Sequence, residues 1–123
     1  MTETNDIMSI SAEMDRINKA ISQAVGQLTE RSRAKAEANA NYEKEIAKKI
    51  IMLKSGEMFE VDGIQMKETQ ASNVEKIARG ICHEFLLQKD VTESAYKNLI
   101  VGIEALQSNL NSLQSRFRHL DNK

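Results

Sequence analysis

The chain has 123 residues, the length of one domain, and its formal net charge is −1 because 17 basic residues nearly balance 18 acidic ones. This balance leaves no overall field that would attract nucleic acid or an anionic membrane. With no Pro, no Trp, 28% charged and 4% aromatic residues, the composition favours long helices over a sandwich, a barrel or an α/β enzyme.

The single cysteine, Cys82, excludes an internal disulfide and a cysteine metal cluster. The sequence has no run of about 18 apolar residues that would cross a membrane. Residues 1–10 lack the basic start and apolar core of a signal peptide. We therefore expect a cytoplasmic protein that makes no contact with a membrane.

The first element is a helix, expected over about residues 6–54. Alanines between Ser32 and Asn41 carry it across a weak stretch, because alanine is the strongest helix former. Ser55-Gly56 ends it, since glycine suits the left-handed position after a helix. The apolar stripe steps by threes and fours through Ile7, Ile10, Met14, Ile17, Ile21, Ala24 and Leu28, then through Tyr42, Ile46, Ile50 and Leu53.

A β-ribbon is expected over about residues 57–67, because Asp62-Gly63 between alternating residues is a strong signal for a two-residue hairpin turn. Four apolar side chains then share one face of the ribbon: Phe59, Val61, Ile64 and Met66. Two interpretations stay open. The ribbon either plugs the end of the helices or presents an apolar surface that binds a partner.

A second helix is expected over about residues 71–120, either continuous or gently kinked near Gly80. Ser72 and Glu75 fit a capping box at its start. Its later part carries a period of about 3.5 residues, which is typical of a coiled coil. The apolar positions of that part are Tyr96, Leu99, Ile103, Leu106, Leu110, Leu113, Phe117 and Leu120.

Folding the chain back at the ribbon pairs residues whose numbers sum to about 127, so that Leu53 meets Val74 and Ile17 meets Leu110. This match predicts an all-α fold: a long antiparallel, coiled-coil-like helical hairpin with a β-ribbon at its tip, forming one domain over residues 1–123. One hairpin buries only one stripe of each helix. We therefore expect a homodimer, an elongated four-helix bundle joined through Leu86, Leu87, Val91, Ile100 and Val101.

Residues that could carry catalysis are sparse. Cys82 and His83 are the only adjacent pair of metal-ligand types, and His119 lies far along the helix from them. No Glu is followed by His at the spacing of a helical di-metal site. The glycines are scattered, without a phosphate-binding loop. We expect no catalytic residue, no cofactor and no metal, and hence no enzyme.

Basic residues gather at two places along the first helix, at Arg31, Arg33, Lys35, Lys44, Lys48 and Lys49. Glutamates interleave with them, at Glu37, Glu43 and Glu45. This mixture favours an ordinary solvated surface over a nucleic-acid site, which remains the alternative interpretation.

Several short motifs carry a resemblance to a known group of proteins: Tyr42-x3-Ile46, Leu53-x2-Gly56, Phe59-x-Val61-Asp62-Gly63-Ile64, Ile77-Ala78-Arg79-Gly80 and Tyr96-Lys97. Over residues 40–115 the chain resembles small helical proteins from the early regions of tailed phages and prophages of Gram-positive bacteria. The resemblance implies an accessory protein in the host cytoplasm, expressed near recombination, replication or counter-defence genes. It brings no catalytic residues.

These observations predict a protein that acts by stoichiometric protein binding. The resemblance implies a host or phage nucleic-acid-processing machine as the partner, such as a recombination factor, a replication factor or a CRISPR effector nuclease. Two other functions stay open: a nucleic-acid-binding accessory protein and a structural spacer of a virion.

Overall fold

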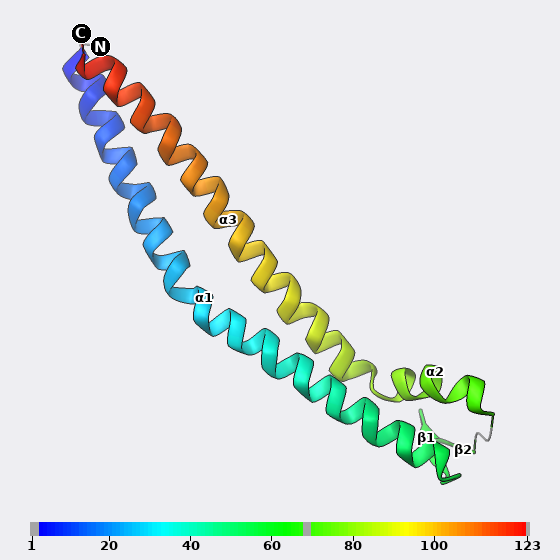
Figure 1. Cartoon of the computed structure of the whole chain (residues 1–123). Helices are drawn as coiled ribbons and strands as arrows, with labels where there is room; N and C mark the ends of the chain where they lie inside the picture. Colours follow the sequence, from blue (N-terminus) through cyan, green and yellow to red (C-terminus); the bar gives the residue numbers. More distant parts are fainter. Residues whose placement is uncertain (1–2, 68–69, 123) are drawn as a thin grey trace. The chain divides into compact units, whose positions relative to one another are not determined.

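The computed structural model describes residues 3–67 and 70–122 of the chain. Helices account for 86% of the described residues. The described residues form helix α1 (Glu3–Lys54), strands β1 (Phe59–Val61) and β2 (Ile64–Met66), helix α2 (Ala71–Ile81) and helix α3 (His83–Asp121) (Figure 1). The mostly helical fold with a small antiparallel ribbon, predicted from the sequence, is confirmed.

The chain divides into two compact units, which are described separately. The first unit combines residues Met1–Ser32 with Ala95–Lys123, and the second is the continuous segment Arg33–Ser94. Both boundaries fall inside helices. They coincide with the stretch in which alanines and charged residues interrupt the apolar stripe.

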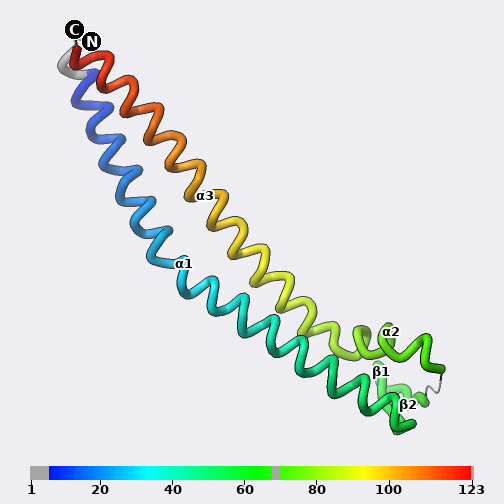
Figure 2. The backbone as a smooth tube through the Cα atoms, in the orientation of Figure 1, coloured from blue at the N-terminus to red at the C-terminus, as the bar shows by residue number. Residues whose placement is uncertain are grey.

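In the first unit, the beginning of α1 and the end of α3 run side by side in opposite directions (Figure 2). Ile10, Ile17 and Ile103 are its buried residues. The other apolar residues of the predicted stripes are half-buried, while most of their neighbours are exposed: Ile7, Met14, Ile21, Leu28, Leu99, Leu106, Leu110, Leu113, Phe117 and Leu120. The two helices thus bury the stripes that the sequence predicts.

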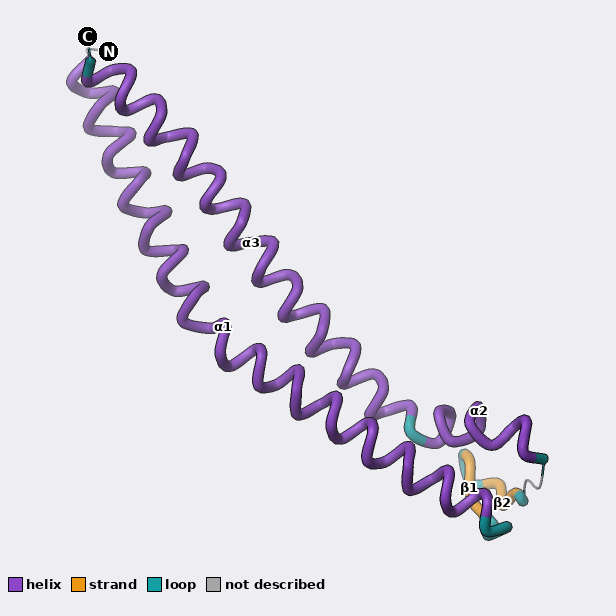
Figure 3. The backbone as a smooth tube through the Cα atoms, in the orientation of Figure 1, coloured by secondary structure: helices purple, strands orange, loops and turns teal. Residues whose placement is uncertain are grey.

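The second unit has a core built from three elements. Leu53 of α1, Phe59 of β1 and the α2 residues Val74 and Ala78 form a buried cluster. Partly buried side chains surround it: Ile46, Ile50, Met52, Val61, Ile77 and Ile81. Figure 3 shows the ribbon beside the end of α1 and α2. The cluster unites residues that the sequence pairs, among them Leu53 with Val74.

Two glycines shape the chain between α1 and the ribbon. Gly56 has a φ of 80°. Its N–H donates to the carbonyl of Leu53 at 3.2 Å, and the N–H of Glu57 donates to the carbonyl of Met52 at 3.4 Å. This pair of bonds is the Schellman motif that ends many helices. At the ribbon turn, Asp62 and Gly63 have φ values of 50° and 81°, which suit the type I′ turn of a two-residue hairpin.

The start of α2 differs from the capping box predicted at Ser72 and Glu75, and that prediction is wrong. The cap residue is Gln70, with φ −82° and ψ 119° and no capping bond from its side chain. Its carbonyl accepts the N–H of Asn73 at 3.1 Å. Glu75 instead accepts a bond from Arg79, one turn further on, at 3.1 Å. Helix α2 therefore starts before Ser72.

The second helix, expected to be continuous or gently kinked near Gly80, is instead divided at Cys82 into α2 and α3. Cys82 has φ −92° and ψ 21°, so its ψ lies outside the helical range. Its N–H still donates to Ala78 at 3.0 Å, and its carbonyl accepts the N–H of Leu86 at 3.1 Å. The chain bends here, and these two backbone hydrogen bonds tie Cys82 to the helix on each side.

Candidate functional site

The ribbon divides its four apolar side chains between the core and the surface. Phe59 is 6% exposed and belongs to the core cluster, against which Val61 packs. Ile64 and Met66 are 64% and 47% exposed, and we call them the β2 pair. The sequence leaves open whether the ribbon plugs the end of the helices or presents an apolar surface. The two interpretations apply to different strands, because β1 seals the core while β2 lies at the surface.

Strand β2 also presents its backbone outward. Its register pairs Val61 with Ile64, Glu60 with Gln65 and Phe59 with Met66. The residues that flank a two-residue turn exchange hydrogen bonds, and bonded and non-bonded pairs alternate along an antiparallel ladder. Gln65 falls at a non-bonded position, so its N–H and C=O point away from β1. All three residues of β2 are exposed.

The five residues predicted to join two copies also differ in exposure. In the second unit, Leu87 and Val91 of α3 are 62% and 54% exposed, and we call them the α3 pair, while Leu86 is half-buried. The members of the α3 pair lie four residues apart and so share one helix face. In the first unit, Val101 is exposed and Ile100 is half-buried.

The basic residues weighed for nucleic acid do not form one cluster on one unit. Arg31 belongs to the first unit, where its guanidinium donates to Gln27 at 3.5 Å. The other five belong to the second unit: Arg33, Lys35, Lys44, Lys48 and Lys49. Lys48 pairs with Glu45 at 3.4 Å. Acidic and basic side chains alternate here, as expected for a solvated helix surface.

Cys82 and His83 stand at the bend between α2 and α3. The Cys82 thiol is only 2% exposed, and this burial raises its pKa; Lys49 opposes the rise and Glu45 adds to it. The Nδ1 of exposed His83 lies 3.1 Å from the Gly80 carbonyl. Within residues 3–67 and 70–122, no three His, Cys, Asp or Glu side chains are grouped closely enough to hold a metal ion.

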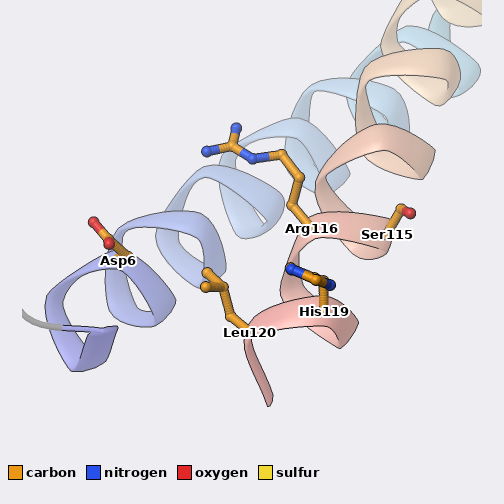
Figure 4. A pocket seen from close by; sticks show the side chains of 5 residues that line it. All are labelled: Asp6, Ser115, Arg116, His119 and Leu120. Atoms are coloured by element: carbon orange, nitrogen blue, oxygen red, sulfur yellow. The ribbon is translucent and has the colours of Figure 1, made fainter. Parts of the chain in front are cut away.

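Two hollows in the protein surface are candidate ligand sites. One, of about 510 Å³, lies in the first unit between Asp6 of α1 and four residues of α3: Ser115, Arg116, His119 and Leu120. Figure 4 shows that the charged groups of Asp6 and Arg116 do not converge on one point. The other, of about 230 Å³, lies in the second unit and is lined by Ala38, Asn41, Glu84, Phe85 and Gln88. Neither arrangement suggests a reaction.

No helix in the described part of the chain is both long and apolar enough to span a membrane. Comparisons with protein-family models, with curated proteins and with solved structures found no match to this chain.

Some surface features were not predicted. Ile51 and Met58, on either side of the turn that ends α1, are 70% and 61% exposed. The ammonium of Lys89 lies 5.2 Å from the centre of the Tyr42 ring, so this lysine covers an aromatic face. The outward backbone of Gln65 was also missed. The alternation of bonded and non-bonded pairs in a two-residue hairpin would have identified it.

Proposed function

We propose that this protein has no catalytic role and acts by binding, both to a second copy of itself and to another protein. The observation that carries the proposal is the exposure of large apolar side chains at two places on the second unit. These are the β2 pair, Ile64 and Met66, and the α3 pair, Leu87 and Val91. Neither pair belongs to the core cluster. Neighbouring apolar side chains left in water are typical of contact surfaces.

Association of two copies is the first part of the proposal. The sequence predicts a four-helix bundle joined through five residues of the second long helix. Of these five, Leu87, Val91 and Val101 are exposed, whereas Leu86 and Ile100 are half-buried. We therefore propose self-association without assigning it to this helix face.

The second part is binding to a different protein. The resemblance noted in the sequence supports a phage or prophage accessory protein that acts on a nucleic-acid-processing machine of the host or the phage. We propose the α3 pair as the contact, because a helix face with apolar residues one turn apart suits packing against another helix.

Capture from a lysate of the host cell, with tagged protein, tests the second part. The double variant Leu87→Ser, Val91→Ser should lose a protein that the parent chain captures at equal loading. Ile51→Ser is the matched control, since Ile51 is even more exposed than Leu87 and Val91 but lies outside both pairs. Capture of the same proteins by the parent chain, the double variant and the Ile51→Ser control would contradict the proposal.

A gel-shift titration with labelled single- and double-stranded DNA distinguishes the nucleic-acid alternative. We expect no binding at physiological salt. Binding that weakens steeply as salt rises, and that is lost when Arg33 and Lys44 are replaced by Glu, would favour the alternative instead.

A further inference from the structure

We infer that the outer edge of β2 is the surface on which two copies of this chain meet. The β2 strand of the second copy pairs with it in antiparallel orientation, and the two ribbons form one sheet of four strands. This inference deepens the proposed function and rests on its self-association. It leaves the α3 pair available to a different protein.

The backbone supplies the first argument. The structure pairs Val61 with Ile64 across a two-residue turn, so the hydrogen-bonding groups of Ile64 are directed toward β1. Those of Gln65 are directed outward. A two-fold axis beside Gln65 places its N–H opposite the C=O of the same residue in the second copy. Both bonds of an antiparallel pair then form, and an identical surface serves on both sides of the contact.

The side chains fit the same register. With Gln65 opposite Gln65, Ile64 of each copy lies directly opposite Met66 of the other. Two apolar contacts form, between side chains that are 64% and 47% exposed in the single chain. A shift by one residue would place Ile64 opposite Gln65 and remove both contacts. The apolar–polar–apolar order of β2 is thus self-complementary.

The charges at the two ends of β2 agree with this arrangement. Asp62 lies in the turn before the strand, and Lys67 follows its last residue. Antiparallel pairing brings Lys67 of each copy beside the turn that contains Asp62 of the other. In this register Lys67 of each copy falls opposite Gly63 of the other, one residue from the opposite charge of Asp62. Strand β1 cannot offer an equivalent surface, because Phe59 and Val61 are committed to the core.

Disulfide formation tests the register. In a Cys82→Ala background, Gln65→Cys places two thiols across the proposed axis, with Cα atoms about 5.5 Å apart, which a disulfide can bridge. Glu60→Cys is the matched control, because its thiols would lie about 14 Å apart, three strand spacings. Mild oxidation should give covalent dimers of the Gln65→Cys chain and not of the Glu60→Cys chain. Equal crosslinking of both, or of neither, would overturn the inference.

A proline tests the hydrogen bonds. Gln65→Pro removes the outward N–H without touching a bond between β1 and β2, whereas Gln65→Ala keeps it. We expect the dimer dissociation constant to rise at least about tenfold for the proline variant and to change little for the alanine variant. Unchanged melting of both variants under monomeric conditions shows that the ribbon is intact.

The outcomes separate this inference from the proposed function. A parent chain that is monomeric at all concentrations overturns both the β2 contact and the self-association, while binding to a different protein is tested separately by the capture experiment. A chain that stays dimeric with Gln65→Pro overturns the β2 contact and leaves self-association standing. If the proline variant melts at a lower temperature, the crosslinking result decides.

Discussion

At the scale of single residues, Phe59 and Ile64 offer a direct comparison, because they lie on one face of the same small ribbon and differ in burial. Replacing Phe59 by Ala should lower the free energy of unfolding by about 3 kcal/mol or more, since it empties part of the core. Ile64→Ala should change it by no more than about 0.5 kcal/mol.

Urea unfolding, followed by circular dichroism at a protein concentration low enough for monomers, measures both values. A loss at Ile64 as large as that at Phe59 would show that β2 is part of the core, and would remove the basis for treating it as a contact surface.

The thiol of Cys82 makes a second prediction at this scale. Because it is almost completely buried, a thiol reagent should modify it slowly in the folded protein and rapidly in denaturant. The rate in the folded protein reports local opening around the bend between α2 and α3. Rapid modification without denaturant would contradict the packing described here.

The same thiol makes stability depend on pH. Burial raises its pKa above the ordinary value of 9.0, so the folded chain holds the proton longer than the unfolded chain. The contribution of this thiol to the free energy of unfolding is fully present below its ordinary pKa and is lost as the pH rises above that pKa. Between about pH 8 and about pH 10, the free energy of unfolding should therefore fall more for the parent than for Cys82→Ala. Parallel pH profiles of the two proteins would contradict this.

At the scale of the elements, the start of α2 separates two models of capping. In a capping box at Ser72, loss of its hydroxyl would cost about 1 kcal/mol. In the structure, Ser72 is the second residue of α2 and Gln70 is the cap. Ser72→Ala should therefore change stability by less than about 0.5 kcal/mol, since alanine favours the helix interior. Thermal melting measures the difference, and a loss near the larger value would support the capping box.

Much of the element order could be predicted because local signals agree with one another. The three-four spacing of Ile7 to Leu28 requires a helix with one apolar face. Asp62-Gly63 and Gly56 need positive φ values that few other residues adopt at low cost. These properties belong to the chain itself and do not depend on distant neighbours.

Other features depend on distant neighbours and could not be predicted. The bend lies at the buried Cys82, whereas the sequence drew attention to Gly80. Phe59 and Ile64 look equivalent in an alternating pattern. Only the packing of α1 and α2 against β1 makes one a core residue and leaves the other in water. The surface that binds another molecule is for the same reason the part least determined by periodicity.

At the scale of the whole molecule, the proposed function of the chain is binding. The chemistry of its side chains offers little else: the one thiol is buried, and the polar groups around the larger hollow do not converge. Exposed apolar surface on the second unit includes a strand edge and a helix face.

The most direct test of this account is the mass of the purified chain in solution. Sedimentation equilibrium over a range from nanomolar to high micromolar concentration should show a reversible change from 13.9 kDa to about twice that value. A mass of 13.9 kDa at every concentration, together with cooperative unfolding, would contradict the proposed self-association and, with it, the β2 contact.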